Sequence, residues 1–207
     1  MSRYCPACYK ARKACICASI TPLQAQTKLV ILQHHTETSQ ALATAPILEL
    51  SLDSCQVLVG EDFTDNAMLN TLLTNPSYHC VLLYPSEQSV ALGQSFSSAE
   101  HQGKALCVIL LDGTWKKAYK MWRLSSNLHS LPSVCLPEGL CGDYRLRKAP
   151  KSHYLSTVEA GYHLLSLLEP DNDFSPLLHS FNQMIDFYMS QMPPEVLASH
   201  YGLEQSD

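Results

Sequence analysis

Lysine and arginine are absent from two long stretches of the 207-residue sequence, 29–103 and 152–207, and each stretch holds eight Asp and Glu residues. All 14 Lys and Arg residues lie in segments 3–28 and 104–151, which together contain only three acids. Folding can place two basic segments on one face of an acidic body, so this distribution predicts a cationic surface for a polyanion despite the formal net charge of −5. The alternative is that folding disperses the two segments around the surface.

The sequence also lacks any apolar run long enough to span a membrane, and its first ten residues, MSRYCPACYK, lack the apolar core of a secretory signal peptide. We therefore expect a cytoplasmic protein with no membrane partner. Nine cysteines, an odd number, in a reducing compartment indicate thiols and metal ligands rather than a disulfide framework. A hydrophobic fraction of 46% excludes a disordered chain.

Short, continuous apolar runs alternate with stretches compatible with helices, and this alternation predicts an α/β fold with a mostly parallel sheet flanked by helices. The expected strands are 28–34, 55–60, 79–85 and 105–113. The expected helices are 40–50, 66–73, 90–101, 114–127, 156–169 and 177–192, and 132–152 is expected to be a loop. The length suits one well-packed domain with small appendages. We expect a Cys-rich head at 1–27, a catalytic α/β domain at 28–192 and a peripheral tail at 193–207.

Four cysteines of the head form the pattern C-x2-C-x6-C-x-C, and these are Cys5, Cys8, Cys15 and Cys17. Four thiolates satisfy the tetrahedral coordination of zinc, and a head this short cannot build an apolar core of its own. The pattern predicts a structural zinc site, because no coordination position stays open; the alternative is four reduced thiols without a metal. Three basic residues within or beside the pattern are expected to face a phosphate backbone, namely Lys10, Arg12 and Lys13.

One acid, Asp112, follows the most apolar expected strand, in the sequence LLDGTWKKAYKMW. Ligands of parallel sheets bind at the carboxyl ends of strands, so this carboxylate is a candidate base or amine ligand; the alternative is that it caps the next helix. Trp115, Tyr119 and Trp122 share one face of that helix, at a spacing typical of core residues. The lysines on its other faces are candidates for phosphate contacts, namely Lys116, Lys117 and Lys120.

A second basic stretch, DYRLRKAPKSHYLSTVEA at 143–160, leads into the helix expected at 156–169. The start of that helix, at Ser156 and Thr157, offers free N–H groups and the positive end of the helix dipole. These features predict a carboxylate or phosphate site; the alternative is a solvated basic loop before an ordinary helix cap. The cations of this stretch are Arg145, Arg147, Lys148 and Lys151.

Three motifs, LDGTW at 111–115, RLRKAPKSHYLSTVEA at 145–160 and LLYPSE at 82–87, together with the Cys-rich head, resemble the DTW-domain family of tRNA-uridine aminocarboxypropyltransferases. The resemblance covers nearly the whole chain. It implies a SPOUT-like fold with a C-terminal knot, and S-adenosylmethionine as donor. The 3-amino-3-carboxypropyl group would pass to N3 of a tRNA uridine, in the variable loop. The chain differs from the family pattern at 35–45, where His35 replaces a proline and Ala43-Thr44-Ala45 replaces Asn-Thr-Gly.

The resemblance also implies roles for particular residues. Asp112 would take the proton of uridine N3. Four residues would hold the amino and carboxylate groups of the donor, namely Arg145, Arg147, Ser156 and Thr157. The remaining donor contacts would be Tyr84, Pro85, Ser86, Asp112, Gly113, Thr114, Trp115, Leu136 and Pro137. The RNA contacts would be Lys10, Arg12, Lys13, Lys116, Lys117, Lys120, Lys148 and Lys151.

Three other functions fit the same residues. The first is an S-adenosylmethionine-dependent RNA methyltransferase of similar knotted fold, and the second is the same transferase chemistry on ribosomal RNA. The third is a zinc-bearing RNA-binding module without catalysis. We expect a monomer with no obligate protein partner, because the pair of C-terminal helices can cover the usual SPOUT dimer interface.

Overall fold

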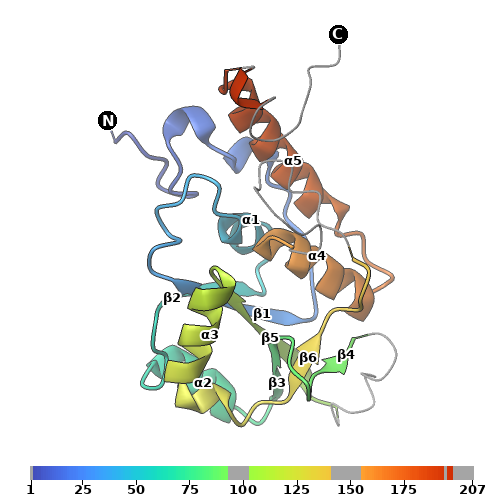
Figure 1. Cartoon of the computed structure of the whole chain (residues 1–207). Helices are drawn as coiled ribbons and strands as arrows, with labels where there is room; N and C mark the ends of the chain where they lie inside the picture. Colours follow the sequence, from blue (N-terminus) through green and yellow to red (C-terminus); the bar gives the residue numbers. More distant parts are fainter. Residues whose placement is uncertain (1, 93–102, 141–154, 194, 198–207) are drawn as a thin grey trace.

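The computed structural model describes residues 2–92, 103–140, 155–193 and 195–197, and its centre is a six-stranded sheet with the order β2-β1-β5-β3-β6-β4 (Figure 1). All five strand pairs are parallel. The strands are β1 (Lys28–His34), β2 (Cys55–Gly60), β3 (Tyr78–Leu83), β4 (Val90–Ala91), β5 (Ala105–Asp112) and β6 (Ser133–Cys135). Their carboxyl ends therefore meet at one edge of the sheet.

Helices cover both faces of the sheet (Figure 1). The α-helices are α1 (Ala45–Ser51), α2 (Ala67–Thr74), α3 (Trp115–Leu124), α4 (Thr157–Leu168) and α5 (Ser175–Ser190). Short 3₁₀ turns lie at Arg12–Ala14, Cys17–Ser19 and Ser126–Leu128. Along β1, Leu29 and Ile31 pack into the core of α1, α4 and α5, whereas Val30 and Leu32 pack into the core of α2 and α3. Burial on both faces explains why this strand reads as a continuous apolar run.

Side-chain caps fix where α2, α3 and α4 begin. Ser156 and Glu159 form a capping box at the start of α4, so two backbone N–H groups of its first turn are satisfied. Inside α4, Gly161 allows close packing on α1, because a Cβ at this position would lie 2.7 Å from Leu48 Cδ2. The start of α4 is thus fixed by its own cap and by direct contact with α1.

The four expected strands are confirmed, to within two residues, as β1, β2, β3 and β5. The structure adds β4 and β6, which lie where a helix (90–101) and a loop (132–152) were expected. These strands have only two and three residues and pair with each other at the sheet edge, so tertiary pairing rather than local pattern defines them. The helix expected from residue 40 begins at Ala45, because Pro46 suits the first helical turn.

The knot implied by the resemblance stays a prediction, since 141–154 lies outside the described residues. Within the described part of the chain, the helices are too short or too polar to cross a membrane.

Candidate active site and metal centre

A cavity of about 1040 Å³ lies at the carboxyl edge of the sheet. Its floor is formed by the ends of β5 and β3, and its walls by the loop before α1, the segment after β6 and the first turns of α3 and α4. A cavity of this size accommodates a nucleoside-sized ligand. Nearly all the described residues predicted to contact the donor line it, namely Tyr84, Pro85, Asp112, Gly113, Thr114, Trp115, Leu136, Pro137, Ser156 and Thr157. Ser86 is not among the lining residues, and Arg145, Arg147, Lys148 and Lys151 lie outside the described residues.

Asp112 is the last residue of β5, and both of its carboxylate oxygens accept hydrogen bonds. Gln33 Nε2 donates to Oδ2 at 2.7 Å, and the Thr157 hydroxyl donates to Oδ1. Gln33 is the register partner of Asp112 in the parallel pair β1–β5, so the sheet itself aligns donor and acceptor. Gln33 was not among the predicted site residues, although a polar residue near the end of an apolar strand is a signal for such a role.

Burial raises the pKa of Asp112 above its ordinary value, against the lowering effect of the hydrogen bonds from Thr157 and Gln33. The nearby Glu37 carboxylate also raises this pKa, and Lys117 lowers it. The result is a carboxylate held in one orientation and more basic than a solvated aspartate. Both properties suit a group that accepts a proton from a bound substrate.

The first turn of α4 reaches the cavity through Ser156 and Thr157, but both hydroxyls have partners within the chain. Ser156 Oγ donates to Glu159 Oε2 at 2.6 Å, and the Thr157 hydroxyl donates to Asp112. The Val158 N–H donates to Thr44 Oγ1 at 3.3 Å, which joins α4 to the loop before α1. These hydroxyls therefore position the helix and the carboxylate, and α4 presents the positive end of its dipole to the cavity.

Two lysines expected to contact phosphates form ion pairs instead. Lys117 Nζ lies 2.6 Å from Glu37 Oε1, and both residues line the cavity. Lys120 Nζ lies 2.9 Å from Glu61, whose carboxylate also contacts His34 Nε2 at 2.9 Å. Glu37, like Gln33, was not among the predicted site residues, because no local pattern distinguishes an acid in a loop that reaches the cavity.

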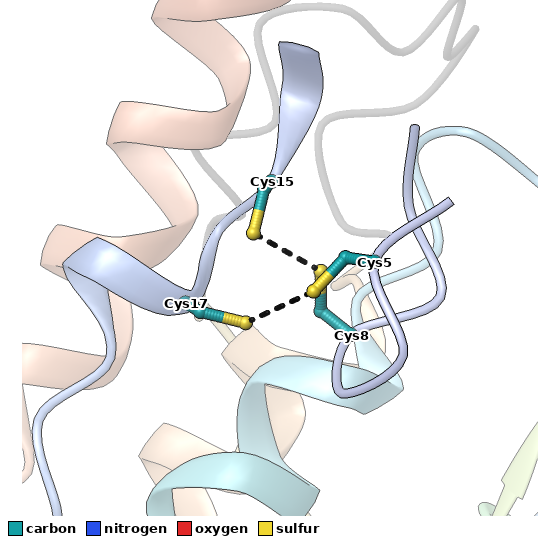
Figure 2. A group of neighbouring side chains, drawn as sticks. All are labelled: Cys5, Cys8, Cys15 and Cys17. Atoms are coloured by element: carbon teal, nitrogen blue, oxygen red, sulfur yellow. Dashed lines mark hydrogen bonds between the residues drawn. The ribbon is translucent and has the colours of Figure 1, made fainter. Parts of the chain in front are cut away.

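The four cysteines of the head converge, and Figure 2 shows their sulfur atoms pointing toward one another. All four sulfurs lie within 4.8 Å of one another, with Cys5 Sγ 3.7 Å from Cys17 Sγ and Cys8 Sγ 3.7 Å from Cys15 Sγ. A tetrahedral zinc with Zn–S bonds of about 2.3 Å separates its sulfurs by about 3.8 Å. Backbone N–H groups of Cys8 and Ala7 lower the pKa of Cys5 to about 6, whereas burial raises the pKa of Cys17 to about 12, so Cys5 is the more readily ionised of these two thiols. The donor set and its spacing thus fit a structural zinc ion.

A family model for the DTW domain matches residues 2–189. The chain belongs to the DTW-domain family. The tRNA-uridine aminocarboxypropyltransferase 2 of Drosophila melanogaster is 33% identical over 172 residues, which are 80% of this DTW protein and 66% of the fly protein. The Mus musculus protein of the same name is 30% identical over 172 residues, 81% of this chain and 57% of the mouse protein. The chain thus spans less than two thirds of these relatives, and no solved structure matches it.

The aromatic residues of α3 in this DTW protein do not form the core face that their spacing predicted. Trp115 and Tyr119 are each 50% exposed, and α3 buries Ala118 and Met121 instead. Two small or flexible residues three positions apart pack against the sheet, so the large rings turn toward the cavity mouth and solvent. The core prediction was therefore wrong for Trp115 and Tyr119; Trp122 is partly buried against the α2–α3 core.

Lys10 corrects a second prediction, because it is buried rather than displayed toward a phosphate backbone. Its Nζ donates to the carbonyl oxygens of Ala41 at 2.8 Å and Ala43 at 2.9 Å, and burial lowers the pKa of Lys10 to about 8. Ala43 lines the cavity, while Cys8 packs into the core of α1, α4 and α5. The segment that carries the four-cysteine cluster is thus connected to a cavity wall through this lysine. Its neighbours Arg12 and Lys13 are exposed, as expected.

Replacing Lys10 with Met should lower the free energy of unfolding by about 1–3 kcal/mol, because the carbonyls of Ala41 and Ala43 would lose the hydrogen bonds from their charged donor. Lys13→Met is the matched control, since Lys13 is exposed two residues before the third cysteine. Chemical denaturation of both variants, with their zinc content measured in parallel, checks this expectation. Equal stability of the two variants would show that the hydrogen bonds of Lys10 contribute nothing.

Proposed function

We propose that this DTW protein transfers the 3-amino-3-carboxypropyl group of S-adenosylmethionine to N3 of a uridine in tRNA. The observation that carries the proposal is Asp112, a largely buried carboxylate of raised pKa fixed by Gln33 and Thr157 at the floor of a nucleoside-sized cavity. The names of the fly and mouse relatives support the same reaction.

In the proposed reaction, the Asp112 carboxylate accepts the N3 proton of the uridine. The N3 electron pair then attacks the γ-carbon of the aminocarboxypropyl group, and the bond between that carbon and sulfur breaks. The bond electrons stay on sulfur, so neutral 5′-methylthioadenosine leaves, and Asp112 later returns its proton to solvent. The sulfonium also activates its methyl carbon, so the choice of product is a matter of which carbon faces N3.

The cavity offers matching groups to each part of the donor. The positive end of α4 suits the donor carboxylate, with Arg145 and Arg147 as further proposed partners. The apolar segment at Leu136 and Pro137 lines the cavity together with Tyr84 and suits the adenine ring. Gln33 donates a hydrogen bond to the Asp112 carboxylate and is not one of the residues that line the cavity. We therefore propose it as a positioning residue.

The acceptor uridine must be unpaired, because N3 lies on its base-pairing edge. The loops of tRNA meet this requirement, and the family resemblance favours the variable loop. Zinc bound by Cys5, Cys8, Cys15 and Cys17 would supply structure rather than chemistry, since four thiolates leave no open position. A monomeric, cytoplasmic enzyme without an obligate protein partner completes the proposal.

The test is a transfer assay with two labels. Purified protein and unmodified tRNA are incubated with S-adenosylmethionine labelled either in the methyl group or in the carboxypropyl carbons. We expect label in the RNA from the carboxypropyl carbons alone, and release of methylthioadenosine in equal amount. Label from the methyl group alone would make the protein a methyltransferase. Absence of label from both donors, on tRNA and on ribosomal RNA, would leave an RNA-binding module.

A further inference from the structure

An uninterrupted row of aromatic rings runs from the cavity to the exposed face of α3. Tyr84 and Trp115 line the cavity, and their ring centroids lie 6.3 Å apart. Tyr84 also stacks on Trp122, with centroids 6.1 Å apart and planes only 5° from parallel, and Trp122 stacks on Tyr119 at 6.1 Å. We call these four residues the aromatic strip. It joins the place of proposed chemistry to a surface outside the cavity, where Tyr119 is half exposed.

Two features of the strip need an explanation beyond packing. Trp115 and Tyr119 each leave half of their surface in solvent, at positions where α3 could have carried polar residues. Tyr119 is also not among the residues that line the cavity, so donor binding does not account for its exposure. Exposed rings beside a site are typical of a surface that receives a partner with flat apolar faces.

The charges around the strip indicate which partner this is. Helix α3 carries four basic residues and no acid. Lys117 and Lys120 are ion-paired, whereas Lys116 and Arg123 are exposed and form no ion pair with the described residues. Rings for stacking combined with unpaired cations for phosphates are the two components of a site for single-stranded nucleic acid.

We propose that the aromatic strip binds the unpaired nucleotides next to the target uridine, with a base stacked on Tyr119 and phosphates near Lys116 and Arg123. This inference rests on the proposed function for the identity of the nucleic acid as RNA. It assigns to the strip the selection of a single-stranded target, because bases paired in a duplex do not expose their faces. Transfer would then start from a strand already held beside the cavity.

A binding measurement that involves no catalysis tests the aromatic strip, and the tryptophans of the chain serve as its fluorescent probe. The two tryptophans of the sequence, Trp115 and Trp122, both belong to the strip, so quenching of tryptophan fluorescence by a short oligouridylate reports its occupancy directly. No donor is added. Tyr119→Leu removes the ring but keeps an apolar side chain, and Tyr119→Phe keeps the ring. We expect Tyr119→Leu to weaken oligouridylate binding about 5- to 150-fold, the range for one base–ring stack, and Tyr119→Phe to bind like the unmutated protein.

Three further measurements separate stacking from other roles of the ring. The Tm of Tyr119→Leu should stay close to that of the unmutated protein. Its affinity for S-adenosylhomocysteine should be unchanged, because Tyr119 lies outside the cavity wall. A blunt RNA duplex should bind more weakly than oligouridylate and be insensitive to Tyr119→Leu.

The two cations have a test of their own. In the double variant Lys116→Gln/Arg123→Gln, the slope of log affinity against log salt should fall by about 1.4, because each phosphate that a cation neutralises adds about 0.7 to this slope.

Full oligouridylate affinity in Tyr119→Leu would overturn the proposal, and so would an equally weakened affinity in Tyr119→Phe or an equally weakened duplex affinity. Failure of the proposed transfer reaction gives a different pattern. Oligouridylate binding that depends on Tyr119 would then persist in a protein that transfers no label.

Discussion

Replacing Asp112 with Asn or Ala should lower kcat/KM for aminocarboxypropyl transfer by about 10²- to 10⁴-fold, the usual contribution of a general base. Both variants remove the proton acceptor, while Asn keeps the shape of the side chain. Binding of tRNA and of S-adenosylhomocysteine should persist in Asp112→Asn. Asp53→Asn is the matched control, since Asp53 is exposed and lies outside the cavity. Retained turnover in both Asp112 variants would refute the base role.

The pH dependence of the reaction should also reveal Asp112 as the general base. Transfer requires the Asp112 carboxylate, so kcat/KM should fall as the pH drops through the pKa of this group. Because burial raises that pKa, the midpoint should lie above about 3.9, the ordinary aspartate value. A pH profile from 4 to 9 measures it, and Asp112→Asn should lose this acid limb. A limb unchanged in the Asn variant would assign the titration to another group.

The stability of Asp112→Asn should move in the opposite direction from its activity. A carboxyl group whose pKa is raised by folding binds its proton more tightly in the folded state, so it stabilises the fold at low pH. That contribution is lost as the pH rises through the folded pKa. At neutral pH the buried charge therefore costs stability, and the neutral amide should be at least as stable. Thermal melts at pH 7 check this, and a large drop in Tm would indicate a structural role instead.

Removal of the metal centre should have the largest effect on stability. The double variant Cys5→Ser/Cys8→Ser should purify without zinc and melt about 10–20 °C below the unmutated protein, because zinc binding supplies several kcal/mol of folding free energy and each kcal/mol shifts Tm by about 2–4 °C. The destabilisation extends beyond the head, since Cys8 and Ile16 belong to the core of α1, α4 and α5.

The metal assay must use protein purified without added metal, and we expect one zinc per chain. Cys55→Ser is the control, because Cys55 lies in β2 and outside the cluster. It should keep the full zinc content, and a chelator should lower its Tm as it does that of the unmutated protein. Absence of metal from the unmutated protein would refute the site.

Much of the candidate site could be predicted from the sequence, because its chemistry lies at the ends of strongly apolar strands. The run before Asp112 defines β5, and the edge rule for parallel sheets places its carboxylate in the cavity. The cysteine pattern likewise predicts a cluster that the fold brings together. In both cases a local signal and a general rule suffice.

The remaining features depend on tertiary structure that no local pattern carries. The spacing of Trp115, Tyr119 and Trp122 is that of a core face, but Ala118 and Met121 compete for the same sheet and are the residues buried. The sequence around Lys10 predicts a surface cation, because it does not show that the fold brings the carbonyls of Ala41 and Ala43 within hydrogen-bonding distance of its ammonium group. Strands β4 and β6 are likewise defined by pairing, because β6 pairs with β3 and β4 pairs with β6 at the sheet edge.

The hydrogen bonds of Lys10 to two carbonyl oxygens have a consequence for which residues of this chain can be exchanged. A carbonyl belongs to the backbone, so Ala41 and Ala43 can be exchanged for other residues while the hydrogen bonds persist, provided that the path of the chain is kept. The lysine has no such freedom, because only a long cationic side chain reaches both oxygens. A head transplanted from a relative must therefore bring a cation two residues after its second cysteine, or the loop before α1 loses its anchor. Head and loop are thus structurally coupled, although the lysine and its two acceptors lie 31 and 33 positions apart in sequence.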